Sequence, residues 1–347
     1  MSERLRIGIA GAGGIARQRH LPGFARIDGV EVVSVANRSR ESSEQVSKEF
    51  GIPRIHDNWR ALVADPNVDA VVIGTWPYLH LPITLAALEF GKHVLTEGRM
   101  AMNADEARQM LAAARAHPEL VTQVVPGPFT LSVDRTVQDL LANGYVGQLQ
   151  AVDVRISSGF VNPDAPMNFR TDRDVSGVNA LVLGIYYESL VRWIGPATAV
   201  TARTRVAVPY RRDPTTGQRR AMLVPDHIEV LLDLAEGALG RMHVSAVAGL
   251  MPGPEIWLYG SDGTLRFEQQ AERLSGARKP DTELRPIDIP PDKRGGWHVE
   301  EEFVSAIRGE QPVRLTTFAD GVRYMEFTEA VHRSSAEGRT NHLPLVS

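Results

Sequence analysis

The residues with the clearest chemical role form the segment Gly11-Ala12-Gly13-Gly14-Ile15-Ala16, which has the pattern G-x-G-x-x-A. In such a segment Gly11 makes a tight turn, and Gly13 lets the backbone come close to a pyrophosphate because it has no side chain. Ala16 is small enough for a helix to pack closely on a sheet. The start of that helix offers unpaired N–H groups and the positive end of its dipole. The pattern predicts a dinucleotide-binding loop, and a glycine-rich turn without a ligand is the alternative.

The residue about 20 positions beyond this loop distinguishes the two nicotinamide cofactors, because an acidic side chain there binds the ribose 2′-hydroxyl of NAD. In this chain Asn37 takes that place and is followed by Arg38 and Ser39. A neutral amide does not repel a 2′-phosphate, and an adjacent arginine can pair with one or stack on adenine. The hypothesis is therefore a preference for NADP. The alternative is NAD, with Asn37 on its ribose and Arg38 as a solvated charge.

The elements that must position this loop are short apolar runs alternating with helical patterns over residues 1–125. The predicted strands are Leu5–Ala10, Val30–Ala36, Ala70–Thr75, His93–Thr96 and Leu120–Val125. The first predicted helix ends at Phe24. The others are Glu41–Phe50, a short helix that Asp57 caps and that runs to Val63, Leu81–Phe90, and the stretch from Asn103 to Ala116. This alternation predicts a parallel, doubly wound Rossmann sheet, whose ligands lie at the carboxyl ends of the strands.

The segment Pro126-Gly127-Pro128 predicts a boundary between two domains, residues 1–125 and 126–347. Beyond it, runs with two-residue alternation predict strands at Leu149–Ser157, Ala199–Val208, His227–Leu234, Leu239–Val247 and Glu255–Tyr259. Helices are predicted at Ser132–Asn143, Ala180–Trp193, Val299–Ile307 and Phe318–Ser334, and a surface loop at Tyr210–Arg220. Few helices separate the later strands, so an α/β domain with an open, mainly antiparallel sheet is expected.

The composition excludes several classes of site. The 347-residue chain has a net charge of −4 and no cysteine. It therefore offers no basic footprint for nucleic acid, no disulfide, no thiolate metal site and no cysteine nucleophile. The ten histidines show no ligand spacing such as H-x-x-x-H, so no metal site is expected. No apolar stretch approaches the roughly 18 residues of a membrane span, and the first residues do not read as a signal peptide, so a cytoplasmic location is expected.

Three segments carry a resemblance to a known family. They are Gly11–Phe24, the run Thr75-Trp76-Pro77-Tyr78-Leu79-His80, and Phe90–Ala101, which contains Gly91-Lys92-His93-Val94-Leu95-Thr96-Glu97. With Gly144–Gly147 and the tail from Phe303, they make the chain resemble the Gfo/Idh/MocA family of sugar and inositol oxidoreductases. The resemblance implies a dinucleotide domain, a sugar-like substrate, and a homodimer or homotetramer built through the C-terminal sheet. It also places Thr75, Trp76, His80 and Glu97 at the cofactor, and the alternatives are packing for Trp76 and a structural role at the helix start for His80.

The departures from the family pattern concern its catalytic residues. The family's E-K-P motif has a catalytic lysine, whereas this chain reads Glu97-Gly98-Arg99. The chain has only four lysines, and Lys92 begins a strand at the end opposite the cofactor crevice. In the second signature, G-G-x-x-x-D-x-G-x-H, the aspartate position is Val182 and the histidine position is Tyr186. Branches that resemble glucose–fructose oxidoreductase and dihydrodiol dehydrogenase also have this tyrosine, but they keep the lysine.

Hydride transfer to a carbonyl needs a proton for the developing alkoxide. Our hypothesis makes Tyr186 the acid/base and Arg99 its electrostatic, substrate-orienting partner, because a fixed cation lowers a tyrosine pKa. The alternatives are a core-packing Tyr186 and an ion-paired Arg99. Arg170 and Asp172, in a segment like the family's W-R-x-D, are candidates for orienting substrate, with a loop ion pair as the alternative.

The expected function is that of an NAD(P)-dependent oxidoreductase that acts on a sugar, a polyol or a related carbonyl compound. Two other classes stay open. An NAD-dependent sugar hydrolase or lyase would recycle a tightly bound cofactor, and a regulatory protein would bind the dinucleotide without turnover.

Overall fold

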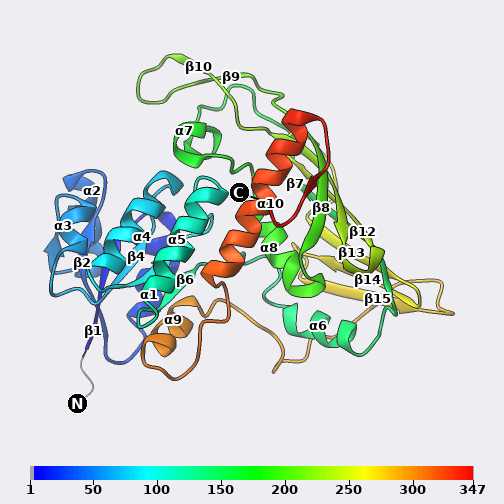
Figure 1. Cartoon of the computed structure of the whole chain (residues 1–347), viewed down its shortest axis with the longest axis horizontal. Coiled ribbons are helices and arrows are strands. Elements are labelled where there is room, and N and C mark those ends of the chain that lie inside the picture. Colours follow the sequence, from blue (N-terminus) through cyan, green and yellow to red (C-terminus); the bar gives the residue numbers. More distant parts are fainter. Residues whose placement is uncertain (1–3, 347) are drawn as a thin grey trace. The chain divides into compact units, whose positions relative to one another are not determined.

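The chain forms two compact units in the computed structural model, which describes residues 4–346 (Figure 1). The first unit runs to Pro126 and includes His298–Val322, and the second comprises Gly127–Trp297 and the chain from Arg323. The expected second domain, residues 126–347, is thus interrupted. Residues 298–322 return to the first unit because Thr316 exchanges backbone hydrogen bonds with Val124 at 2.9 and 3.0 Å.

The first unit holds a six-stranded sheet in the order β3-β2-β1-β4-β5-β6, and every neighbouring pair is parallel. Its strands are β1 (Leu5–Ala10), β2 (Val30–Ala36), β3 (Arg54–Ile55), β4 (Ala70–Ile73), β5 (His93–Thr96) and β6 (Thr122–Val124). Its helices are η1 (Ala16–His20), α1 (Leu21–Phe24), α2 (Arg40–Phe50), α3 (Trp59–Val63), η2 (Pro77–Leu79), α4 (His80–Glu89), α5 (Ala104–Ala116) and α9 (Val299–Ile307). The predicted doubly wound parallel sheet is confirmed, and the strand order reverses between β1 and β4.

Polar side chains cap the starts of three helices of the first unit, and one of these caps differs from the prediction. Ser39 caps α2 and Asn103 caps α5, each accepting a backbone N–H of the first turn. Helix α3 was expected to be capped by Asp57, but Asn58 accepts the Ala61 N–H at 3.1 Å. Asp57 stands one residue too early in the chain and is instead paired with Arg40 at 2.9 Å.

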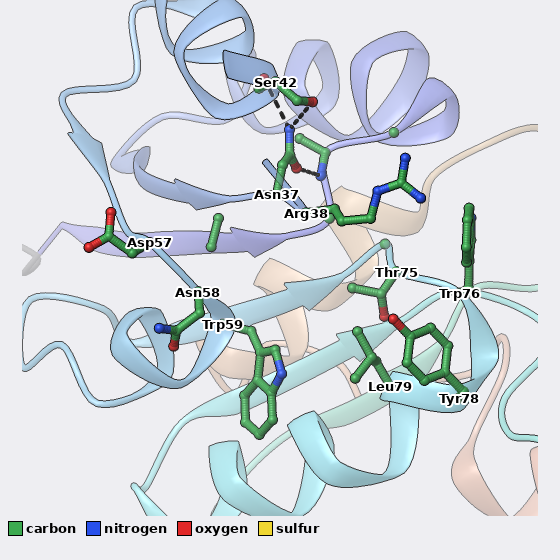
Figure 2. Close-up of a pocket in the computed structure, with 15 residues that line it drawn as sticks. Asn37, Arg38, Ser42, Asp57, Asn58, Trp59, Thr75, Trp76, Tyr78 and Leu79 are labelled. Carbon is green, nitrogen blue, oxygen red and sulfur yellow. Dashed lines mark hydrogen bonds between the residues drawn. The ribbon is translucent and has the colours of Figure 1, made fainter. Parts of the chain in front are cut away.

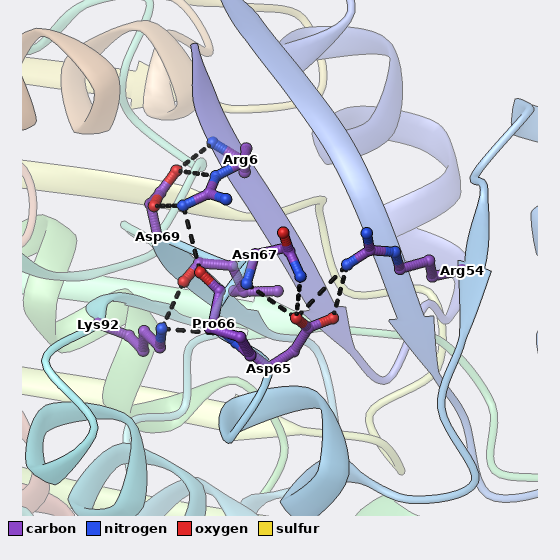
Figure 3. Close-up of polar contacts among 8 residues, drawn as sticks. Arg6, Arg54, Asp65, Pro66, Asn67, Asp69 and Lys92 are labelled. Carbon is purple, nitrogen blue, oxygen red and sulfur yellow. Dashed lines mark hydrogen bonds and ion pairs between the residues drawn. The ribbon is translucent and has the colours of Figure 1, made fainter. Parts of the chain in front are cut away.

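A polar cluster ties the amino ends of the strands together (Figure 3). Arg6 in β1 holds Asp69, just before β4, with hydrogen bonds of 2.6 and 2.9 Å. Lys92 donates to the carbonyls of Val68 at 2.6 Å and Asp65 at 3.2 Å. The ammonium of Lys92 is therefore engaged at the amino end of β5, which agrees with the reason for excluding it from the cofactor crevice.

The second unit is built on a nine-stranded sheet in the order β16-β15-β14-β13-β7-β12-β11-β8-β17. Its strands are β7 (Leu149–Ser157), β8 (Ala197–Arg205), β11 (His227–Leu234), β12 (Leu239–Ser245), β13 (Glu255–Gly260), β14 (Gly263–Glu268), β15 (Arg273–Arg278), β16 (Arg285–Pro286) and β17 (Asn341–His342). Only β7 and β12 pair in parallel, so the predicted open, mainly antiparallel sheet is confirmed.

Helices α8 (Leu183–Ile194) and α10 (Phe318–Glu337) pack on one face of this sheet (Figure 1). The second unit also contains α6 (Asp134–Ala142), η3 (Phe169–Thr171), α7 (Arg173–Ser176) and η4 (Ala235–Gly237), which connects β11 and β12. Tyr187 of α8 stacks on Phe327 of α10 with ring centroids 3.6 Å apart. The expected loop Tyr210–Arg220 is wrong, because Tyr210–Arg212 (β9) and Arg219–Ala221 (β10) pair as a small hairpin. Among residues 4–346, no helix combines the length and hydropathy needed to cross a membrane.

Candidate active site

The glycine loop after β1 has the geometry that a phosphate site requires. Gly11 has a φ of +90°, and a Cβ there would lie 2.7 Å from the backbone nitrogen of Thr75. A Cβ on Gly13 or Gly14 would meet no atom within 4 Å, so this side of the loop is open. Ala16 is 2% exposed. The loop therefore joins a tightly packed turn to backbone that a ligand can approach closely.

A cavity of about 500 Å³ opens beside this loop (Figure 2). It is lined by Gly11, Ala12, Gly13, Ala36, Asn37, Arg38, Ser42, Asp57, Asn58, Trp59, Gly74, Thr75, Trp76, Tyr78 and Leu79. These residues follow the carboxyl ends of β1, β2, β3 and β4, where dinucleotides bind in doubly wound sheets. Of the predicted cofactor residues, the lining includes Gly11, Gly13, Asn37, Arg38, Thr75 and Trp76.

The amide of Asn37 is already bonded on both sides. Its Oδ1 accepts the backbone N–H of Ala12 at 2.7 Å, and its Nδ2 donates to the carbonyl and hydroxyl oxygens of Ser42 at 3.1 and 3.0 Å. Asn37 thus fastens the end of β2 to the phosphate loop. A ribose hydroxyl could use this amide only in competition with those bonds.

Arg38 lies exposed at the rim of the cavity, with its guanidinium carbon 5.5 Å from the centre of the Trp76 ring. None of the ion pairs found among residues 4–346 uses Arg38, whereas Arg40 is paired with both Glu44 and Asp57. Ser39, predicted to bind cofactor, caps α2 instead and does not line the cavity. Gly14 and Ile15 are exposed at the start of the helix but are also outside the lining.

His80 occupies a structural position between two loops. Its ring is 1% exposed, with Nε2 2.9 Å from the carbonyl oxygen of Thr75 and Nδ1 3.2 Å from that of Met100. Burial lowers the pKa of His80, although both carbonyls act in the opposite direction. The hydroxyl of Thr75 is buried and has no hydrogen-bond partner within the described part of the chain. His80 therefore fixes the Thr75 backbone at the cavity, and Thr75 keeps a hydroxyl to offer.

The two residues of the altered E-K-P segment lie in different surroundings. Glu97 follows β5, and its carboxylate is hydrogen-bonded to His20 at 2.9 Å. Arg99 is 8% exposed, so its charge is buried rather than in solvent.

Two adjacent tyrosines of α8 differ in how their hydroxyls are used. The Tyr187 hydroxyl accepts the Ala197 N–H at 2.8 Å, so this side chain packs with its polar atom satisfied. Tyr186 is 3% exposed and stacks on Phe129 at 4.0 Å, but its buried hydroxyl has no partner among residues 4–346. Burial raises the pKa of Tyr186, opposite to the lowering that the sequence hypothesis assumed. Tyr186 therefore remains protonated and able to donate.

The two candidates for orienting substrate, Arg170 and Asp172, also differ in their contacts. Asp172 caps α7 and pairs with Arg220 of β10 at 3.2 Å, so its carboxylate has a structural task. Arg170 is exposed, with its guanidinium carbon 4.4 Å from the centre of the Phe169 ring. Arg170 is thus the member of the pair with a charge to offer.

Nine lining residues were not among the predicted site residues: Ala12, Ala36, Ser42, Asp57, Asn58, Trp59, Gly74, Tyr78 and Leu79. Tyr78 and Leu79 lie inside the segment from Thr75 to His80, so its position after β4 was a usable signal. Trp59 starts a helix after a strand of only two residues, and no motif marked it.

Two family models match the chain, one in each unit. Residues 5–124 match the oxidoreductase family with an NAD-binding Rossmann fold, and residues 135–266 match the GFO/IDH/MocA C-terminal domain. The chain is 29% identical to dTDP-3,4-didehydro-2,6-dideoxy-α-D-glucose 3-reductase of Streptomyces antibioticus, covering 95% of this chain and 97% of that protein. It is 33% identical to mouse trans-1,2-dihydrobenzene-1,2-diol dehydrogenase, over 71% of this chain and 70% of that one. Among solved structures, levoglucosan dehydrogenase in complex with NADH and L-sorbose superimposes with a TM-score of 0.88 at 20% identity, covering 98% of this chain and 99% of that chain.

Proposed function

The chain belongs to the Gfo/Idh/MocA family of oxidoreductases, and we propose that it transfers hydride between NADP, or less readily NAD, and a sugar-like carbonyl compound. The observation that carries the proposal is the cavity beside the open glycine loop, at the point where the strand order reverses. Its residues fit a dinucleotide, since Gly13 and Gly14 leave room for phosphates and Thr75 keeps an unpartnered buried hydroxyl.

The preference for NADP is supported by the charges at the rim. Arg38 lines the cavity and takes part in none of the ion pairs found among residues 4–346. Its guanidinium is therefore available to a 2′-phosphate. Asn37 has no charge to repel that phosphate, and its amide is occupied by Ala12 and Ser42. An acid that would bind the two ribose hydroxyls of NAD is missing from this position.

The bound cofactor supplies or accepts the hydride, and the chain must move the proton. We assign the proton donor to Tyr186, whose raised pKa keeps its hydroxyl protonated and whose hydroxyl has no partner among the described residues. In reduction this O–H donates to the alkoxide that forms on the substrate, and in oxidation the phenolate accepts the proton back. We assign a substrate-orienting positive charge to Arg99, and the orientation of a hydroxylated substrate to Arg170.

The substrate class is supported by the relatives. The named activities include a dTDP-sugar 3-reductase and, in Ensifer adhaerens, a 1,5-anhydro-D-fructose reductase that is 32% identical over 56% of this chain. A carbonyl on a sugar ring, or the corresponding alcohol, is therefore the class that we propose.

A spectroscopic screen at 340 nm tests this function. The purified chain is assayed with NADPH and NADH against keto sugars, anhydro sugars and sugar nucleotides, and with the oxidised cofactors against the alcohols. We expect cofactor oxidation by a keto sugar and the reverse reaction with its alcohol. Release of a sugar substituent without net NADH, or binding without any turnover, would instead favour the lyase or the regulatory protein.

A homo-oligomer built through the open face of the C-terminal sheet is also proposed. Leu231 of β11 and Leu239 of β12 are 60% and 61% exposed on neighbouring strands. Exposed leucines on one face of neighbouring strands favour burial against another copy.

A further inference from the structure

A buried histidine lies between two carboxylates in the first unit. The Nδ1 atom of His20 is 2.5 Å from Oε1 of Glu300, and its Nε2 is 2.9 Å from Oε1 of Glu97. The side chains of His20 and Glu300 are 0% and 1% exposed, and that of Glu97 is 16% exposed. The contacts join the helix after the phosphate loop, the carboxyl end of β5, and α9.

The two carboxylates determine the protonation of the ring. A neutral imidazole has one N–H and can donate to only one of them, whereas the imidazolium donates to both. Burial alone would lower the pKa of His20, but the hydrogen bonds and charges of Glu300 and Glu97 outweigh it and raise the pKa to about 9. At neutral pH the chain therefore keeps a buried, titratable cation behind Glu97.

The chain makes room for this arrangement at Gly23 of α1. A Cβ on Gly23 would lie 2.7 Å from Cδ of Glu300 and 2.8 Å from its Oε2. Any larger residue would push the Glu300 carboxylate off the ring of His20. The triad thus depends on a specific close approach between α1 and α9.

The position of Glu97 relates the triad to the cofactor. The cavity is lined by residues that follow β1, β2, β3 and β4, and its end beside Asn37 and Arg38 suits the adenosine half of a dinucleotide. The pyrophosphate belongs at the glycine loop, and the nicotinamide half must continue towards β4 and β5. Glu97 is the first residue after β5, and the hydrogen bond of its side chain within residues 4–346 uses only Oε1. The Glu97 carboxylate therefore lies at the strand end towards which the nicotinamide half continues.

We propose that His20 is a positioning residue which, with Glu300, holds the Glu97 carboxylate in place for the hydroxyl and amide donors of the bound nicotinamide riboside. This rests on the proposed use of a nicotinamide cofactor. The charged groups that face His20 are Glu97, from the end of β5, and Glu300, from α9. Glu97 also acts on His80, whose pKa burial nevertheless lowers. The triad places a titratable cation next to a segment that lacks the family's lysine.

The binding of two ligands distinguishes a positioning role of His20 from a purely structural role. NADPH contains the nicotinamide riboside, whereas 2′,5′-ADP contains only the adenosine bisphosphate half. We expect Glu97→Gln and His20→Gln to weaken NADPH binding about tenfold at pH 7, because one hydrogen bond to a charged group is lost or misplaced. Binding of 2′,5′-ADP should remain within twofold of the parent, as measured by fluorescence titration and calorimetry. NADH and ADP replace the two ligands if the chain prefers NAD.

The pH dependence of NADPH binding gives the second readout. In the parent, affinity should fall as pH rises through about 9, when His20 loses its proton. In Glu300→Gln this fall should move to lower pH, since one carboxylate no longer favours the imidazolium. His117→Gln is the matched control, because His117 faces Glu119 at 3.6 Å on the surface of the same unit.

Equal losses for NADPH and 2′,5′-ADP, or a Glu300→Gln profile that overlaps the parent's, would overturn the proposal. If His20→Gln does not fold, Glu97→Gln and Glu300→Gln decide the question. Binding needs no turnover, so a failure to find a sugar substrate leaves this test intact.

Discussion

The side-chain oxygen of Asn37 accepts a 2.7 Å hydrogen bond from the backbone N–H of Ala12, and this bond joins the end of β2 to the phosphate loop. The same amide donates to the carbonyl of Ser42 at 3.1 Å. The position that distinguishes NAD from NADP in Rossmann folds is thus also a structural link, and a substitution there changes both.

Asn37→Asp should reverse the cofactor preference. The aspartate can still accept from Ala12, but its second oxygen would face the Ser42 carbonyl, and its charge would repel a 2′-phosphate. We expect the ratio of NADPH to NADH affinity to fall at least tenfold in fluorescence titrations. Asn103→Asp is the control, because it adds the same charge at the cap of α5. An unchanged ratio in Asn37→Asp would contradict the assignment of this position.

Arg38→Ala should weaken NADPH specifically. Loss of a charge-assisted pair with the 2′-phosphate removes about 1.5–3 kcal/mol, which is at least a tenfold loss of affinity. NADH affinity should change by less than threefold. Arg40→Ala, two residues away and paired with Glu44 and Asp57, should alter neither. Equal losses for both cofactors in Arg38→Ala would show that the guanidinium binds adenine rather than phosphate.

The local parts of this site were predictable from the sequence, because they depend on neighbours in the chain. The G-x-G-x-x-A loop and the strand Leu5–Ala10 follow from spacing and apolar pattern alone, and both are present. The strand Arg273–Arg278 was missed because it contains Gly276 and one large apolar residue, Leu274, so its pattern is weak.

The remaining parts depend on distant pairs that no local pattern encodes. His20 and Glu300 are 280 residues apart in the chain, and neither belongs to a motif that predicts the other. Whether Tyr186 or Tyr187 keeps an unpartnered hydroxyl depends on where the N–H of Ala197 lies. The sequence could name both tyrosines but could not tell them apart.

The stability of the fold should decrease from pH 6.5 towards pH 9. His20 has a pKa of about 9 in the folded chain and an ordinary value of 6.5 when unfolded, so the folded state binds the proton more tightly. Its contribution is complete below pH 6.5 and is lost as pH rises through 9, to a total on the order of 3 kcal/mol. Denaturant unfolding at several pH values measures this slope, which Glu300→Gln should reduce. A parallel slope in parent and variant would contradict the ion triad.

The proposed oligomer should dissociate when a charge enters the exposed sheet face. Leu231→Glu would place a carboxylate among residues that we expect to be buried between copies, at a cost of several kcal/mol. Light scattering should then give the monomer mass, near 38.1 kDa. Leu223→Glu is the control, since Leu223 is equally exposed at 60% but lies outside the sheet. A monomeric parent chain would contradict the oligomer itself.

Replacing Tyr187 should affect stability but not activity, whereas replacing the adjacent Tyr186 should affect activity but not stability. Tyr187→Phe leaves the Ala197 N–H without its acceptor, so it should lower the free energy of unfolding by about 1–3 kcal/mol while the reaction rate is retained. Tyr186→Phe removes a buried hydroxyl that has no partner among residues 4–346, so stability should be unchanged or slightly higher. Because that hydroxyl is the proposed proton donor, kcat with an active sugar should fall about 10²–10⁴-fold. Turnover in Tyr186→Phe equal to the parent's would assign Tyr186 to packing against Phe129, and the proton would have to come from another group.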